Sequence, residues 1–576
     1  MTTNNIKDVK TVDAENFDYL LAESNFRIES VFRSRNKAFI PCLNPILGKK
    51  IEDFDVTKWV EGDAQTYPGN VFNFNYDAVD YKLIDLKDWV FDIQGQFYWD
   101  DTAASNNAKW KPQIPVFGNQ FLFSLFSSME LYIDDTLVQR INNPGMCSNA
   151  EYALRYPHNK EEEKTLTVHG WCINDPLKYK LENNATSNTA DVIDSYNPGI
   201  WLSWKQIEGE GVDKPQTVRV MGNFAQRIRL ADMFSVVDTL PPIYDHKITV
   251  RLQRSNHNYM IVNTANCKAN EELCKFIGFN KFQGYIDEYV TTDQYIATAK
   301  KYYSKPIETL ITMDKQLLVP LLTKPSKASE QTININVDAA FKNKLLTLAI
   351  PRTTNFTGQR NKIKHYLASN IDNTKAGLEY DVLKAPANSY TFGGLKSLIV
   401  CAGGTQLYKF DMGADGTITG DKELFKLNDD MTQYNVEATT TGANKIYMSN
   451  YQNVYEQYKR ARLHFQQLED EALDFGTFMK EYCIYCVDLS CFTLTPGQNI
   501  TVELTTDKWG DDYNPYYAYN SNKLISDTTK EGEYTNTSIN INMFYDKVLR
   551  LLPNHRIELA DMISTSSVEV ENSNMA

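Results

Sequence analysis

Alternation of apolar and polar residues dominates the first half of the chain and predicts half-buried β-strands. Between residues 88 and 99, one face of an extended strand would carry the apolar side chains Trp89, Phe91, Ile93, Phe97 and Trp99. Residues 129–134 alternate in the same way, and Asp134-Asp135 predicts a tight turn before a return strand at Leu137 and Val138. Further strands are predicted over 217–221, 247–253 and 284–290.

The same kind of pattern continues in the second half of the chain. Strands are predicted over 307–313, 332–337, 344–350, 398–402, 500–504 and 538–545. In the last of these, Ile539, Ile541, Met543 and Tyr545 lie on one side, with Asn540 and Asn542 between them. This spacing predicts a strand with one apolar face and one polar face.

Helical patterns are scarce by comparison. Residues 451–468 place one apolar stripe at helical spacing, formed by Tyr451, Val454, Tyr455, Tyr458, Phe465 and Leu468. This stripe predicts a helix that packs against the second β region. A short amphipathic helix is predicted near 17–31, and residues 291–304 also have helix-like spacing. We place the boundary between two β domains at this second segment.

These patterns divide the chain into five parts. We predict an N-terminal arm and lead-in over 1–80, a first β domain over 81–292, a connector over 293–305, a second β domain over 306–560 and a polar tail over 561–576. The first domain would carry a long polar loop over 155–216, and the second a helical insertion near 447–470. Many short strands with almost no strand–helix alternation indicate sandwiches or jelly rolls.

Composition and charge narrow the possible classes of protein. Hydrophobic residues are 42% and charged residues 23% of 576, which is typical of a globular chain. The net charge of −14 argues against a surface that coats nucleic acid. No apolar run approaches the ~18 residues of a membrane span, and residues 1–17 lack the apolar segment of a signal peptide. The nine Cys are odd in number and irregularly spaced, which predicts free thiols in a reducing compartment.

No motif for catalysis or cofactor binding emerges. Phosphate-binding glycine loops, zinc-protease and serine-hydrolase motifs are absent. Cys483, Cys486 and Cys491 are the nearest pattern to a zinc site, but they lack a second ligand pair, and we interpret them as thiols of a buried strand. We therefore expect no catalytic, cofactor-binding or metal-binding residues, no cofactor and no enzymatic activity.

Residues 411–423 are the nearest pattern to a calcium-binding loop. Gly413 and Lys422 occupy positions where an EF-hand needs oxygen ligands, so we interpret the segment as a polar hairpin. The sequence leaves calcium binding there an open question.

Five segments, in order, resemble blocks of the double jelly-roll major capsid proteins. The resemblance is to the group found in virophages, polinton-like viruses, adintoviruses and Maverick/Polinton elements. The segments are 115–135, 148–157, 169–176, 224–255 and 473–490. One departure is at Asp134-Asp135, where that family usually has Asn-Gly. The resemblance implies an all-β fold of two consecutive eight-stranded antiparallel jelly rolls with loop insertions and a few short helices.

The same resemblance implies a structural role in a virion. The chain would be a major capsid protein, assembling as hexon-like, pseudo-hexameric homotrimers into the icosahedral shell of a double-stranded DNA virus or virus-like element. Its partners would be other copies of itself, then penton and minor or cement capsid proteins. Because the chain is acidic, it would contact packaged DNA only indirectly. It would have no membrane span and would be made and assembled inside the host cell rather than secreted.

Two other classes stay open at this point. One is a β-sandwich minor capsid protein or a receptor- or glycan-binding spike, and the other is a β-sandwich enzyme. For the capsid interpretation, we expect deletion of residues 1–40 to leave folded trimers and to impair shell assembly, because the arm would lie under the shell.

Overall fold

The structure is a computed structural model. It describes residues 34–42, 71–77, 82–103, 116–117, 121–158, 166, 171, 201–206, 216–254, 261–262, 275–290, 306–320, 331–338, 342–351, 390–391, 395–411, 426–427, 434–435, 443–475, 478, 482–492, 494–495, 497–506, 538–552 and 556–560.

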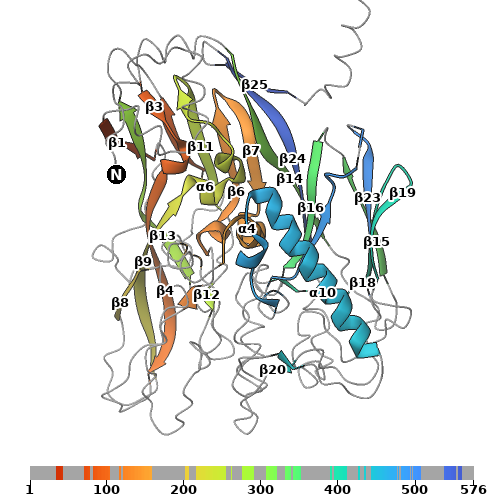
Figure 1. Cartoon of the computed structure of the whole chain (residues 1–576). Coiled ribbons are helices and arrows are strands. Elements are labelled where there is room, and N and C mark those ends of the chain that lie inside the picture. The colour runs from red at the N-terminus through yellow and green to blue at the C-terminus, as the bar shows by residue number, and fades with distance from the viewer. Residues whose placement is uncertain are drawn as a thin grey trace, which may run out of the picture.

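Two antiparallel sheets form a first sandwich in the N-terminal half (Figure 1). One sheet has the order β1 (Ser34–Pro41), β13 (Lys275–Val290), β4 (Val90–Ala103), β9 (Gln216–Arg229) and β8 (Trp201–Gln206), and the short β3 (Lys82–Ile84) and β10 (Ile243–Tyr244) extend it beside β13. The other has the order β2 (Val71–Asp77), β11 (Lys247–Arg254), β6 (Phe126–Ile133) and β7 (Thr136–Asn142). Numbered along the chain, the eight main strands pair as 1-8-3-6 and 2-7-4-5, which is the connectivity of a jelly roll.

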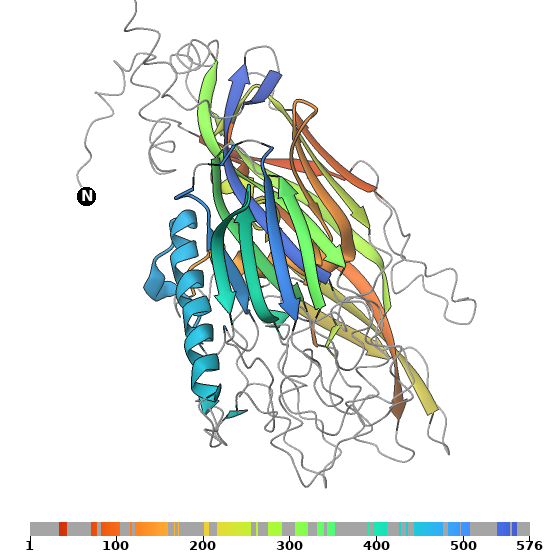
Figure 2. The same ribbon diagram turned by 90° about the vertical axis from the view of Figure 1, so that its right-hand side faces the viewer.

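The C-terminal half repeats this connectivity. One sheet has the order β14 (Ile307–Pro320), β24 (Ser538–Leu552), β16 (Lys342–Pro351) and β22 (Ile484–Asp488). The other, seen face-on in Figure 2, has the order β15 (Gln331–Asp338), β23 (Asn499–Thr506), β18 (Leu395–Ala402) and β19 (Thr405–Asp411). The strand β25 (Arg556–Ala560) forms a hairpin with the end of β24. The predicted fold of two consecutive eight-stranded jelly rolls is confirmed.

The other described elements are short, with one exception. The helices are α4 (Pro144–Arg155), α6 (Leu230–Met233) and the longer α10 (Ala443–Ala461), and the 3-10 turns are η3 (Leu86–Asp88), η4 (Phe121–Leu125), η6 (Ser235–Asp238), η8 (Arg462–Phe465) and η9 (Glu469–Glu471). Five two-residue strands complete the set: β5 (Val116–Phe117), β12 (Ile261–Val262), β17 (Tyr390–Thr391), β20 (Lys426–Leu427) and β21 (Tyr434–Asn435). In the described part of the chain, no helix has the length and apolar character needed to cross a membrane.

The turn between β6 and β7 lies at the predicted position. Asp134 and Asp135 both adopt left-handed backbone conformations, with φ of 47° and 63°. Two such residues in succession are typical of the tight turn that matches the twist of a β-hairpin. The Asp134 carboxylate also accepts a hydrogen bond from the backbone N–H of Lys247 at 2.8 Å. The turn is therefore attached to β11 as well as closing the hairpin.

The first jelly roll has an aromatic core that follows the predicted alternation. Trp89, Phe91 and Ile93 are all buried on one face of β4 and its lead-in. A glycine is required opposite them, because a Cβ at Gly284 of β13 would lie 2.9 Å from Trp89 Nε1. Each such large side chain contributes about 1.5–3 kcal/mol when it is fully removed from water.

The structure corrects the predicted N-terminal arm. Both β1 and β2 fall inside residues 1–80, yet they are the first two strands of the first jelly roll. Ile40 of β1 is buried in its core. Deleting residues 1–40 would therefore remove most of the sheet strand β1. The sequence analysis missed this strand because β1 is short and the pairing of an edge strand leaves no local sequence signal. The predicted start of the first domain at residue 81 is therefore wrong, whereas its end at 292 and the limits at 306–560 and 561–576 remain predictions.

Other predicted elements differ from the structure or lie outside the described residues. The loop over 155–216 contains a strand, β8, which pairs with β9. The predicted helix over 451–468 ends earlier, because α10 stops at Ala461 and Gln466 has a left-handed φ of 61°. Leu468 is consequently 58% exposed instead of belonging to the buried stripe, whereas Val454 and Tyr458 are buried as predicted. The helices near 17–31 and 291–304, the connector over 293–305 and the loop residues 412–423 lie outside the described residues.

Candidate functional site at the interface of the two jelly rolls

The cysteines singled out from the sequence are core residues in two of three cases. Cys483 and Cys486 are buried before and within β22, as predicted, and Cys491 is exposed. Burial raises the pKa of the Cys483 thiol to about 12, and it also raises the pKa of Cys486. Neither thiol is available as a thiolate at neutral pH. Within the described ranges, no three His, Cys, Asp or Glu side chains are grouped so that they could hold a metal ion.

The two jelly rolls complete each other's cores. The apolar cluster of the first one includes five residues from the strands β14, β24 and β25 of the second: Ile311, Met313, Leu549, Leu551 and Ile557. In return, the cluster of the second one includes Ala150, Tyr152, Ala153 and Leu154 of α4, together with Trp171. Figure 1 shows α4 between the two sandwiches. The halves are therefore interlocked and do not merely touch at their surfaces.

The polar face of β24 lies against the first jelly roll. The sequence predicted one polar side for this strand, and its residues Asn540 and Asn542 are only 3% and 2% exposed. The side-chain amide of Asn542 donates to Glu151 Oε1 of α4 at 3.1 Å. Asn540 Oδ1 accepts from Gln316 Nε2 of β14 at 3.2 Å. We call this buried polar contact region between the sandwiches the seam.

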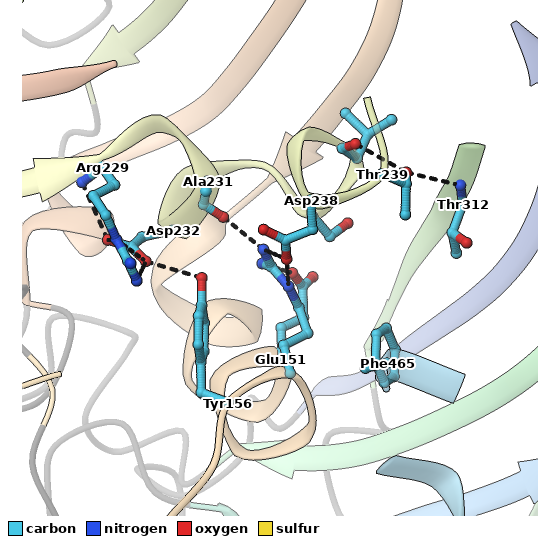
Figure 3. Close-up of polar contacts among 12 residues, drawn as sticks. Glu151, Tyr156, Arg229, Ala231, Asp232, Asp238, Thr239, Thr312 and Phe465 are labelled. Carbon is cyan, nitrogen blue, oxygen red and sulfur yellow. Dashed lines mark hydrogen bonds and ion pairs between the residues drawn. The ribbon is translucent and has the colours of Figure 1, made fainter. Parts of the chain in front are cut away.

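Gln139 of β7 bridges the seam. Its Nε2 donates to Ser235 Oγ at 2.9 Å and to Asp314 of β14, and its Oε1 accepts from the backbone N–H of Val236 at 3.1 Å. Nearby, the backbone N–H of Thr312 donates to Thr239 Oγ1 at 3.1 Å (Figure 3). Side-chain hydrogen bonds thus join β7 of the first jelly roll to β14 of the second, and they favour one relative position because most buried polar groups keep a hydrogen-bond partner.

A buried guanidinium lies beside these bonds. The side chain of Arg155, at the end of α4, is 2% exposed, and its Nη2 lies 2.6 Å from Asp238 Oδ2 and 2.6 Å from the backbone oxygen of Ala231. Glu151 Oε2 is 3.8 Å from its Nη1. Charge-assisted hydrogen bonds of this kind are about twice as strong as neutral ones. They connect α4 to the segment α6–η6.

A second ion pair supports the same helix end. Tyr156 donates its hydroxyl to Asp232 Oδ1 at 2.9 Å, and Arg229 Nη2 is 2.7 Å from the same oxygen (Figure 3). The second jelly roll holds this helix end from the other side. Tyr458 of α10 donates to the backbone oxygen of Ala153 at 2.8 Å, and Arg462 Nη2 to that of Tyr156 at 2.8 Å.

The seam holds more acidic than basic groups around Glu151. Asp314 and Asp238 are its acidic neighbours and Arg155 its basic one. Burial, and then the charge of Asp314, raise the pKa of Glu151 to about 8. Burial likewise raises the pKa of Asp314 to about 6. Both shifts favour the protonated carboxyls, which lowers the negative charge of the seam.

The segments with a family resemblance meet at this seam. Arg155 and Tyr156 of the 148–157 segment contact Asp238 and Asp232 of the 224–255 segment. Trp171 of the 169–176 segment lies 6.3 Å, between ring centroids, from Tyr482 of the 473–490 segment. Four of the five segments therefore contact one another in pairs, and the Trp171–Tyr482 contact joins the two sandwiches.

Sequence reasoning did not single out Glu151, Arg155 or Asp314. A signal was present at Asp314, which directly follows the predicted strand 307–313 and precedes the apolar residues 317–319. A charge between two such segments marks either a surface or a buried partner. The choice between the two depends on what packs against the strand.

Comparison with known proteins supports the architecture. No family model matches the chain, and no curated protein matches it. A chain in the cryo-EM structure of the Sputnik virophage is 11% identical over 95% of this chain and 92% of that chain, with a TM-score of 0.53. The mavirus major capsid protein is 9% identical over 92% and 98%, with a TM-score of 0.46. PBCV-1 Vp54 is 11% identical over 92% and 97%, with a TM-score of 0.44. The Sputnik similarity shows a shared fold along nearly the whole of both chains.

Proposed function

We propose that this chain is a major capsid protein, whose homotrimers form pseudo-hexameric tiles of the icosahedral shell of a double-stranded DNA virus or virus-like element. The observation that supports this most strongly is the fusion of two complete jelly rolls into one unit through interlocked cores. The fold shared with the Sputnik virophage chain and the family resemblance of five sequence segments point in the same direction.

The physical argument concerns shape. Three copies of a double sandwich place six sandwiches around one axis, and such a block can fill a hexagonal position in a lattice. The block can serve as a tile only if the two sandwiches of one chain keep a fixed relative orientation. The buried bonds from Gln139 to Asp314 and from Asn542 to Glu151 favour one orientation, because a rotation of one sandwich against the other would break both of them.

This role has consequences for packaged DNA and for partner proteins. In the proposed virion, copies of a chain with a net charge of −14 would repel packaged DNA, so genome condensation would depend on other proteins or cations. The partners would be neighbouring trimers, penton proteins and minor or cement proteins. The function would be structural and would require no catalytic residue or cofactor.

The mass of the purified full chain in solution tests the proposal. Light scattering should give three times the chain mass of 66.0 kDa, and negative-stain images should show particles with a hexagonal outline. A stable monomer or dimer over the micromolar range would overturn the proposal.

A further inference from the structure

The seam holds more acid than its nearest cation can neutralise. The carboxyl groups of Glu151, Asp238 and Asp314 lie near the single guanidinium of Arg155. Asp238, which is 43% exposed, forms the close ion pair with Arg155 at 2.6 Å. Glu151 and Asp314 are both buried. Because Glu151 belongs to α4 of the first jelly roll and Asp314 to β14 of the second, repulsion between their charges acts across the seam.

Other charged groups around these two carboxyls already have partners. On β24, Asp546 lies 2.8 Å from Lys344 of β16, and on α6, Asp232 lies 2.7 Å from Arg229. Arg462 of η8 donates to a backbone oxygen at the far end of α4. Among the described residues, Arg155 is therefore the cation that acts on both carboxyls. The other side chains that form described seam hydrogen bonds are neutral, namely Gln139, Ser235, Thr239, Gln316, Asn540 and Asn542.

Two buried oxygen atoms at the seam lack a hydrogen-bond donor in the described part of the chain. Asp314 accepts from Gln139 through Oδ1, but its Oδ2 has no such partner. Asn542 donates through its amide nitrogen to Glu151 Oε1, and its own Oδ1 is likewise without a partner. A carboxylate only accepts hydrogen bonds, whereas a protonated carboxyl also donates one. A proton on Glu151 or Asp314 therefore supplies a missing donor and also removes a charge.

We propose that the seam is a proton-operated latch, in which loss of the proton held by Glu151 or Asp314 increases transient opening between the two jelly rolls while each sandwich stays folded. The inference concerns a contact within one chain and does not depend on the proposed function. Because the shared apolar clusters keep the closed state dominant, the proton changes how often the seam opens rather than its average structure.

The direction of the pH effect follows from the closed and open states. Burial raises the pKa of Glu151 to about 8 in the closed seam, whereas opening returns the carboxyl to water and to its ordinary value of 4.5. The closed seam therefore binds one proton more, and the opening constant should rise about tenfold per pH unit until the pH passes about 8. Above that pH both states have lost the proton, and the opening constant should level off. Asp314, with a pKa of about 6, adds to the rise at lower pH.

Cys147 of α4 reports opening without any change to the chain. Its side chain is buried and interacts with Gln316 of the second jelly roll, so opening of the seam should expose it to a thiol reagent. Burial raises the pKa of this thiol, so it adds no charge to the closed seam. Cys486 is the control, because it lies in the core of the second sandwich and should become exposed only when that sandwich unfolds.

Maleimide labelling of the full chain between pH 6 and pH 9, followed by site-resolved mass spectrometry, tests the proposal. Each rate is divided by the rate for the urea-unfolded chain at the same pH, which removes the effect of thiol ionisation. The corrected rate at Cys147 should rise about tenfold from pH 6.5 to pH 7.5, level off above pH 8 and exceed the rate at Cys486 by at least about tenfold. Equal rates at the two thiols, or a rate at Cys147 that does not change with pH, would overturn the proposal.

A variant separates the latch from other effects of pH. Glu151→Gln keeps the size of the side chain and a donor group but has no proton to lose, so the corrected rate at Cys147 should stay constant above pH 7. Asp92→Asn is the matched control, because the Asp92 carboxyl is paired with Arg227 on another sheet, and it should keep the wild-type profile. Circular dichroism checks that each variant is folded, and Asp314→Asn replaces Glu151→Gln if the latter is not. A wild-type pH profile in the folded seam variant would overturn the proposal.

Discussion

The side-chain amide of Asn542 donates a hydrogen bond to Glu151 at 3.1 Å, across 391 positions of sequence. It joins the last long strand of the second jelly roll to a helix of the first. Both side chains are buried, so neither has water as an alternative partner. The bond therefore favours one relative placement of the sandwiches, which is the property that a capsid tile requires.

Glu151 should make the stability of the chain depend on pH. Its pKa of about 8 in the folded chain lies above the ordinary 4.5 of a glutamate. Because the folded state binds the Glu151 proton more tightly than the unfolded state does, Glu151 contributes to the stability of the fold. This contribution to stability is fully present below pH 4.5 and is lost as the pH rises through about 8. In Glu151→Gln, the loss should disappear, and the variant should be more stable than the wild type at pH 9, on the order of a few kcal/mol.

Thermal unfolding of both proteins between pH 5 and pH 9 measures this effect. The Asp314 carboxyl remains in the variant, so some loss of stability near its pKa of about 6 should persist in both curves. Parallel curves for the two proteins over the whole range would contradict the prediction.

Removal of the buried guanidinium should loosen α4 from the segment α6–η6. Arg155→Met leaves Asp238, which is 43% exposed, without its ion-pair partner and the buried backbone oxygen of Ala231 without its donor. An unsatisfied buried acceptor costs about 1–3 kcal/mol. Arg550→Met is the matched control, because the Arg550–Glu308 pair, at 2.7 Å, is exposed. Exposed pairs contribute only about 0–1 kcal/mol. Urea unfolding compares the two variants, and equal losses of stability would refute the role of Arg155.

Two truncations should distinguish the role of residues 1–33 from that of the strand β1. Deletion of residues 1–33 stops before β1 and should leave a folded protein. Deletion of residues 1–41 removes β1 and the buried Ile40, and should lower stability by more than about 2 kcal/mol through lost burial and lost strand pairing. The thermal midpoint and soluble yield of both truncations check this, and a normal midpoint after the longer deletion would contradict the assignment of β1.

Thiol labelling should distinguish the cysteines of the 473–490 segment from their neighbour. Cys483 and Cys486 are buried with raised pKa values, whereas Cys491 is exposed. In the native protein at pH 7.5, maleimide should modify Cys491 within minutes and leave the other two unmodified until the chain unfolds. Site-resolved mass spectrometry follows each thiol, and rapid native labelling of Cys486 would show that β22 is open to solvent.

The local pattern of apolar and polar residues was sufficient to predict most strands. The alternation of Trp89, Phe91 and Ile93 marks a buried face, and Asp134-Asp135 marks a hairpin turn, because both depend on residues that are neighbours in the chain. The order of five short segments then indicated a tandem of jelly rolls. The topology that joins distant strands was available only through that resemblance.

The local sequence pattern does not predict which element covers each face of a strand. The alternation of apolar and polar residues separates the two sides of β24, but it does not say what lies over each side. It therefore places Asn540 and Asn542 on a polar side without predicting that they are buried. Asn542 is buried against Glu151 of α4, which comes almost 400 positions earlier in the chain. Long-range packing likewise placed the charge of Asp314 in the interior and made β1 a sheet strand. Those contacts turn two sandwiches into one unit.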